Sequence, residues 1–159
     1  PYEIKEYDIA PVMVMSIRVI VPFSDIGSSM DSAFTRLYGY LTYAKAKFAG
    51  PPFSLYHAEN CGETQLDMEI CAPVEDFVPE EPDIKARVVD EAKGRMLRYI
   101  HKGPYEDLGK IYPDIMNWME ENGWEWDTDL PMREIYLNDP DRSRPDELLT
   151  EIVCPVRKK

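Results

Sequence analysis

The chain has 159 residues, of which 44% are hydrophobic and 30% are charged, and this composition predicts one folded domain rather than a disordered chain. Its 30 acidic and 18 basic side chains give a formal net charge of −12, which argues against direct binding to nucleic acid or to anionic membranes. The longest apolar runs are far shorter than the roughly 20 residues that a membrane-spanning helix needs.

The cysteines and histidines are few and scattered. Cys61, Cys71 and Cys154 are odd in number and contain no CxxC pair, which disfavours a disulfide framework and a zinc site. His57 and His101 have no neighbour at the spacing of metal ligands. We therefore expect a cytoplasmic protein that uses no metal and no other cofactor.

The first half of the chain is predicted to form a strand, a helix and two further strands. Residues 12–21 are rich in Val, Ile and Met, as strands are. Apolar residues then recur at helical spacing over residues 29–48, until Gly50 and two prolines end the pattern. Two short β-rich runs follow, at residues 53–57 and 66–72.

The second half repeats this order. Residues 95–101 form the predicted strand, and residues 106–122 form the helix, which Gly123 ends. Two strands close the unit, at residues 132–138 and 150–156. An acidic, proline-containing connector separates the two halves at about residues 75–82.

Sequence identities link the two halves directly. The hexapeptide EICAPV begins at Glu69 and EIVCPV begins at Glu151, and four of the six positions are the same. Ser54 and Tyr56 in the first half occupy the strand that corresponds to Glu134 and Tyr136 in the second. Two units are too few for a solenoid, so a pseudo-symmetric domain is the better interpretation.

These observations predict an α+β fold. We expect residues 1–159 to form a single domain, with one repeat over about residues 1–74 and the other over about residues 83–159. Each repeat is a β-α-β-β module, and the modules are related by a pseudo-twofold axis. The predicted architecture is an antiparallel sheet with helices on one face and a ligand groove on the other.

Side-chain alternation along the strands locates this groove. Successive residues of a strand point to opposite faces, so Ile135 and Leu55 belong to one face, and Glu134, Tyr136 and Tyr56 belong to the other. Because helices need apolar partners, we expect them on the Ile135 face. The tyrosine face would then stay open as a groove that contains a carboxylate.

Three further residues are candidates for the same groove. Tyr99 and Tyr105 lie close to it in the predicted order of elements, and Glu69 stands at the position equivalent to Glu151. Aromatic faces attract flat or cationic organic molecules, and a partly desolvated carboxylate adds an electrostatic anchor. Desolvation also raises the pKa of a carboxyl group, which suits a general acid or base. Alternatively, Glu134 is a solvated residue on the wet face of a strand.

Several sequence blocks resemble one known family. The blocks are HKGPYE at residues 101–106, Trp118, EIYLNDP at residues 134–140 and TEIVCPV at residues 150–156. In this order they resemble the GyrI-like small-molecule-binding domain over nearly the whole chain. The resemblance implies a pseudo-twofold pair of β-α-β-β modules with a hydrophobic ligand groove. It also implies that Glu134 matches a glutamate that contacts cationic ligands in relatives fused to DNA-binding domains.

Two functions compete at this stage. The favoured one is a stand-alone domain that binds lipophilic or cationic organic molecules, with a protein partner or a homodimer left open. No helix-turn-helix is recognisable, so transcription control by this chain alone is in doubt. The alternative, which the resemblance also implies, is a hydrolase that opens the strained cyclopropane of reactive natural products. In that case Glu134 is the catalytic acid or base that activates water, assisted by Tyr136, Tyr105 or Glu69.

Overall fold

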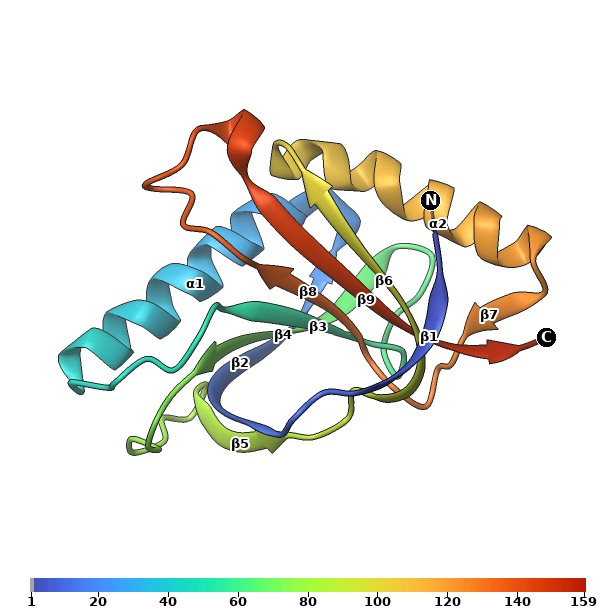
Figure 1. The fold of residues 1–159 in the computed structure, drawn as a ribbon. Coiled ribbons are helices and arrows are strands. Elements are labelled where there is room, and N and C mark those ends of the chain that lie inside the picture. The colour runs from blue at the N-terminus through green and yellow to red at the C-terminus, as the bar shows by residue number, and fades with distance from the viewer. Residues whose placement is uncertain (1) are drawn as a thin grey trace.

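The computed structural model describes residues 2–159, whose nine strands form one antiparallel sheet beside two helices (Figure 1). The elements in chain order are β1 (Ile4–Asp8), β2 (Val12–Pro22), α1 (Ile26–Tyr43), β3 (Phe53–His57), β4 (Gln65–Pro73), β5 (Lys85–Val89), β6 (Lys93–Lys102), α2 (Leu108–Glu121), β7 (Trp124–Trp126), β8 (Met132–Tyr136) and β9 (Leu149–Lys158). Helix α1 ends earlier than the sequence predicts, and the chain then adopts a left-handed backbone at Lys45 (φ 59°).

The order of strands confirms the predicted fold class. The sheet runs β1-β6-β9-β8-β3-β4-β2-β5, and β7 pairs with β9. The units β2-α1-β3-β4 and β6-α2-β8-β9 therefore have the same pairing pattern, and their strands β3 and β8 meet at the centre. There Ser54 lies directly opposite Glu134. The two remaining strands are exchanged between the units. Strand β1, which precedes the first unit, pairs with β6 of the second, and β5, which precedes the second unit, pairs with β2 of the first.

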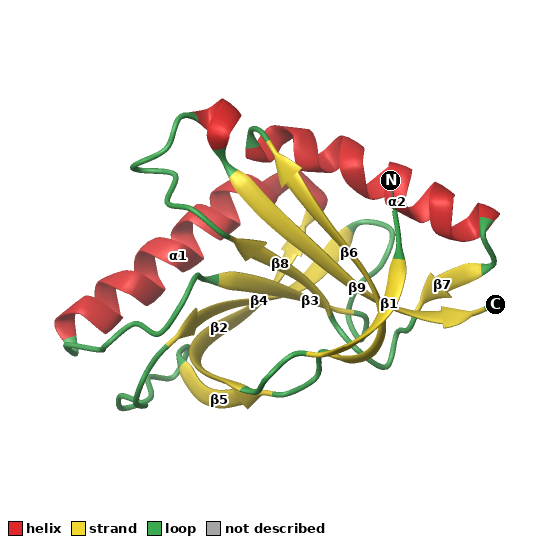
Figure 2. Cartoon of the chain, in the orientation of Figure 1, coloured by secondary structure: helices red, strands yellow, loops and turns green. Residues whose placement is uncertain are grey.

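The two helices lie on the same face of the sheet (Figure 2). Leu37 and Leu41 bury the apolar stripe of α1 in a core that β2 and β4 line. Ile115 and Met119 of α2 pack in a second core with side chains of β6, β8 and β9. Each helix is thus centred on the outer strands of its own unit, and β3 and β8 lie between the two helices. Within residues 2–159, neither helix is long and apolar enough to cross a membrane.

The opposite face of the sheet is also buried, which corrects one prediction. Leu55 is 0% exposed, and it packs with Phe53, Ile135 and Val89 rather than against a helix. The same cluster contains Val14 of β2 and Cys71 of β4, which lie between Leu55 and Val89 in the order of strands. The face that carries Glu134 is the one beneath the helices. The groove predicted on the face away from the helices is therefore on the same face as the helices.

Candidate functional site

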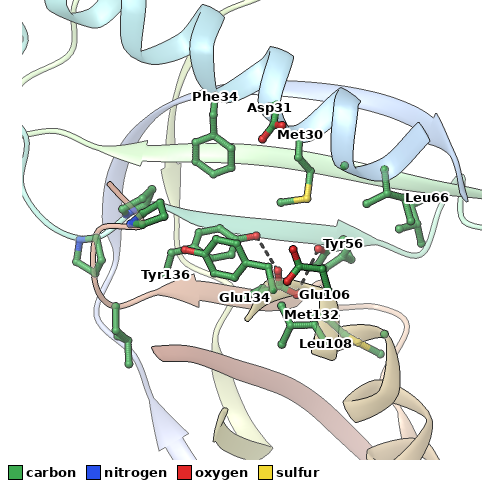
Figure 3. A pocket seen from close by; sticks show the side chains of 18 of the residues that line it. Met30, Asp31, Phe34, Tyr56, Leu66, Glu106, Leu108, Met132, Glu134 and Tyr136 are labelled. Carbon is green, nitrogen blue, oxygen red and sulfur yellow. Dashed lines mark hydrogen bonds between the residues drawn. The ribbon is translucent and has the colours of Figure 1, made fainter. Parts of the chain in front are cut away.

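A large groove separates α1 from α2 and has β3 and β8 as its floor (Figure 3). Its volume is about 1800 Å³. Its walls are mainly apolar and aromatic, and they include Met30, Phe34 and Tyr38 from α1, Tyr112 and Met116 from α2, Tyr56 from β3, and Met132, Glu134 and Tyr136 from β8. The groove exists because each helix is centred on the outer strands of its own unit and leaves the two central strands uncovered.

Glu134 lies at the floor of this groove and is held by tyrosines. Its side chain comes from the middle of β8, and only 3% of the residue is exposed. The Tyr136 hydroxyl donates to Oε1 at 2.7 Å, and the Tyr112 hydroxyl donates to Oε2. The Tyr56 hydroxyl lies 3.4 Å from Oε2 and makes a longer third bond. Tyr136 lies on β8 itself, Tyr56 comes from the neighbouring strand β3, and Tyr112 comes from α2, so the site depends on the packing of that helix.

No cation balances the charge of Glu134 among the residues that the structure describes. It takes part in no ion pair there, although it is buried. The groove lining contains no Lys, Arg or His side chain, whereas it includes four more carboxylates, those of Asp31, Glu106, Asp139 and Asp141. A buried carboxylate without a cation is costly, and the acidic rim adds to the negative potential of the groove.

Burial sets the protonation behaviour of this cluster. Burial raises the pKa of Glu134, and the hydrogen bonds from Tyr112, Tyr136 and Tyr56 partly oppose that rise by stabilising the carboxylate. Burial, together with the nearby charge of Glu134, also raises the pKa values of Tyr112 and Tyr136 well above their ordinary range. The tyrosines therefore remain neutral donors over the physiological range of pH.

Ser54 completes the network in the place where the first repeat lacks a glutamate. Its Oγ lies 2.9 Å from the Tyr136 hydroxyl. Because that hydroxyl donates its own proton to Glu134, Ser54 donates to Tyr136. The duplication is thus asymmetric at its centre, since one repeat supplies the carboxylate and the other supplies a hydroxyl that orients a tyrosine.

A second buried glutamate, Glu69, lies on the opposite face of the sheet. It accepts two bonds from Arg87, at 2.8 and 2.9 Å, one from Ser16 at 2.7 Å and one shared with His57 Nε2 at 2.9 Å. Burial would raise the pKa of Glu69, but the hydrogen bonds from His57, Arg87 and Ser16 outweigh it and hold this pKa well below its ordinary value. Glu69 is a paired structural carboxylate.

The structure brings together four of the six candidate residues. Glu134, Tyr136, Tyr56 and Tyr105 line the groove. Glu69 does not, because the residues of β4 that face the helices are its neighbours Met68 and Ile70. Tyr99 does not line the groove either. It lies on the face of the sheet that the helices cover, but its ring packs against the Tyr2 ring in the core of the second unit, with the ring centroids 5.2 Å apart. The prediction that Glu69 and Tyr99 line the groove is therefore wrong.

Sequence reasoning missed Tyr112, whose hydroxyl donates to Glu134. Tyr112 stands next to Ile111 and one turn after Leu108, at the margin of the apolar stripe that predicted α2. A tyrosine at that margin is a signal for a groove wall, since it presents an apolar ring and a polar tip. The spacing alone does not show which strand its hydroxyl reaches.

The fold and the groove together are those of a small-molecule-binding domain. Comparison with known proteins identifies the family of this domain. Residues 2–157 match the GyrI-like small molecule binding domain, and the chain belongs to this family. No curated protein sequence matches the chain.

Solved structures with a similar fold include a complex with DNA and a complex with a small organic cation. EcmrR in its DNA complex has a TM-score of 0.78 and 29% identity over 99% of this chain, which spans 58% of the EcmrR chain. The separate EcmrR C-terminal domain has a TM-score of 0.72 and 28% identity, with 99% of both chains covered. SAV2435 bound to tetraphenylphosphonium has a TM-score of 0.65 and 12% identity over 99% of this chain and 94% of its own. The likeness to SAV2435 shows the fold alone.

Proposed function

We propose that this domain binds lipophilic organic cations in the groove between α1 and α2, and that Glu134 is the electrostatic anchor. The observation that carries the proposal is the pairing state of Glu134: a carboxylate that is 3% exposed, has three tyrosine donors and has no cation within residues 2–159. A bound cation would supply the missing countercharge in a site of low dielectric, where the attraction is strong.

The tyrosines determine what kind of cation fits. Because the oxygens of Glu134 already accept from Tyr112, Tyr136 and Tyr56, a ligand meets aromatic rings before it meets the carboxylate. A strongly hydrated ammonium ion would lose its water and gain at most one direct hydrogen bond from this carboxylate. A delocalised or shielded cation loses little hydration, gains cation–π contacts and still feels the charge behind the rings. The groove therefore favours bulky apolar cations.

The direct test compares a cation with a neutral molecule of similar shape. Tetraphenylphosphonium, which SAV2435 binds, is titrated into the protein by calorimetry beside neutral triphenylphosphine oxide. Wild type should bind tetraphenylphosphonium at least about 10-fold more tightly than the neutral oxide, which corresponds to about 1.4 kcal/mol. Glu134→Gln should remove most of that difference, because it removes the charge that attracts the cation.

Glu106→Gln is the matched control. It removes the same charge from an exposed position on the wall of the same groove, so tetraphenylphosphonium affinity should change by no more than about threefold, as expected for a screened charge. If Glu134→Gln binds the cation as tightly as wild type, the anchor is wrong. If Glu106→Gln weakens binding as much as Glu134→Gln, the acidic potential of the whole groove, rather than Glu134, selects the ligand.

The hydrolase hypothesis has less support. The raised pKa of Glu134 suits a general base. Three of the roughly four acceptor positions of its carboxylate, however, are taken by tyrosine hydroxyls, so at most one position is left for a water molecule. Incubation with a cyclopropane-bearing alkylating compound, followed by mass spectrometry, tests this alternative, and turnover that disappears in Glu134→Gln would establish it.

Other predictions from the sequence remain predictions. A cytoplasmic location rests on the cysteines, and the absence of direct nucleic-acid binding rests on the charge of −12. The division into repeats at about residues 1–74 and 83–159 rests on the sequence identities between the halves.

A further inference from the structure

We propose that the groove contains a second subsite, which takes a neutral planar aromatic molecule and can be filled while a cation occupies the site at Glu134. This inference rests on the proposed function for the cation site only. The second subsite is the wall formed by Phe34, Tyr38 and Phe48, which we call the aromatic wall.

The groove is larger than one drug-sized ligand requires. Pockets that hold one drug-sized molecule measure about 300–1000 Å³. This groove measures about 1800 Å³, and its lining extends from α1 and the following loop across the floor to α2. A single compact cation beside Glu134 would leave much of the α1 side unfilled.

The rings of the aromatic wall form a single row. Phe34 and Tyr38 stand one turn apart on α1, with ring centroids 6.2 Å apart and planes 19° apart. Tyr38 and Phe48 continue the row at 5.1 Å and 29°. All three residues line the groove, and Phe48 is 44% exposed. The three nearly parallel rings form one continuous apolar surface along the groove, against which the hydrophobic rings of a flat ligand pack.

The charge distribution separates this wall from the cation site. Neither Phe34 nor Phe48 carries a charge, and burial raises the pKa of Tyr38 to about 12, so its hydroxyl remains neutral. That hydroxyl makes no hydrogen bond within residues 2–159, so it can donate to an acceptor on a ligand. The wall itself therefore offers uncharged aromatic surface and one donor, with the exposed carboxylate of Asp31 beside it, whereas the Glu134 site holds a buried charge.

Tyr136 lies between the two subsites. Its ring meets the Phe34 ring edge-on at 5.7 Å and 74°, and its hydroxyl donates to Glu134 (Figure 3). Two ligands would therefore lie on either side of one tyrosine. A single molecule in which a cationic centre is joined to fused aromatic rings would span both subsites.

The test uses two probes together. N-phenyl-1-naphthylamine is neutral and aromatic, and its fluorescence rises in an apolar environment. It is titrated into the protein with and without saturating tetraphenylphosphonium. We expect one equivalent of the amine to bind in both cases, with an affinity change below about threefold, because the probes occupy different walls. Complete displacement of one probe by the other would overturn the second subsite, and so would a lack of amine binding.

Three variants assign the subsites. Phe48→Leu should weaken the amine about 3- to 10-fold, the range expected when an aromatic contact is lost, and should leave tetraphenylphosphonium within about twofold. Phe77→Leu is the matched control, because Phe77 is 43% exposed and does not line the groove. Glu134→Gln should weaken only the cation. If the amine binds but tetraphenylphosphonium does not, the cation proposal fails and the aromatic subsite stands. If the cation binds but the amine does not, the aromatic subsite fails and the cation proposal stands.

Discussion

Glu69 and Glu134 lie on opposite faces of one sheet, and each is 3% exposed. The carboxylate of Glu69 is held by the guanidinium of Arg87, by His57 and by Ser16. The carboxylate of Glu134 is held by neutral hydroxyls alone. The two residues are therefore equally shielded from solvent, and the clear difference between them is the countercharge.

This difference separates a structural carboxylate from one available to a ligand. A buried ion pair is complete within the fold, and its removal damages the fold. A buried carboxylate without a cation lowers the stability of the free protein. A cationic ligand removes this unfavourable free energy when it binds, and its affinity is higher by that amount. The pKa shifts express the same contrast, since the pKa of Glu69 is lowered and that of Glu134 is raised.

The largest expected effect is on stability. Glu69→Gln should lower the free energy of unfolding by about 2–3 kcal/mol, because it leaves Arg87 without its buried partner. This loss lies at or below the lower end of the usual range of about 3–5 kcal/mol, since Arg87 keeps its bond to Glu91 and is partly exposed. Glu134→Gln should leave stability at pH 7 unchanged or raise it by up to about 1 kcal/mol. Denaturant unfolding of both variants measures the contrast, and equal losses would remove it.

The pH dependence of stability should have opposite signs at the two sites. Glu69 has a lowered pKa in the folded state, so its contribution is present above about pH 4.5 and is lost as the pH falls further. Glu134 has a raised pKa, so the folded state is penalised as the pH rises from about 4.5 through that pKa. Unfolding measured between pH 3 and pH 8 should show these trends as differences between wild type and each Gln variant. Parallel differences would contradict the assignment.

Sequence alternation predicted part of this contrast and missed the rest. It grouped Glu134 with Tyr136 and Tyr56 correctly, because a strand enforces that grouping whatever covers it. It could not show which face the helices cover, since the Leu55 face is also apolar and buried, in a cluster that includes Phe53, Cys71 and Val89.

Strand β4 carried a clearer signal for the covered face. Its Met68 and Ile70 alternate with Asp67 and Glu69, which marks the Met68 face as the apolar one under a helix. By contrast, the contact between Tyr112 and Glu134 depends on how α2 sits over β8, and residue spacing within one helix does not determine that distance.

A smaller effect is expected from Tyr112→Phe. The variant keeps the ring and removes one donor to Glu134, so the pKa of Glu134 should rise further and tetraphenylphosphonium affinity at pH 7 should fall about threefold. Tyr99→Phe removes the same atom from a tyrosine outside the groove and serves as the control. Calorimetric titration measures both, and an equal response in the two variants would show that Tyr112 does not act through Glu134.

The smallest effect is expected from Ser54→Ala. Tyr136 loses one neighbour but keeps its 2.7 Å bond to Glu134, so cation affinity should stay within about twofold and stability should fall by no more than about 1 kcal/mol. The same titration and unfolding measurements apply. A loss as large as that of Glu134→Gln would mean that the Ser54 hydroxyl, rather than the carboxylate, organises the site.

The proton balance of binding tests the central claim most directly. If the cation is attracted to the ionised form of Glu134, binding must lower the raised pKa of this group and release protons at pH values near that pKa. Tetraphenylphosphonium is titrated by calorimetry between pH 4.5 and pH 7 in two buffers of different ionisation enthalpy. We predict net proton release from wild type in part of this range and less release from Glu134→Gln at the same pH. Equal release from both proteins, or none from wild type at any pH in this range, would contradict the account.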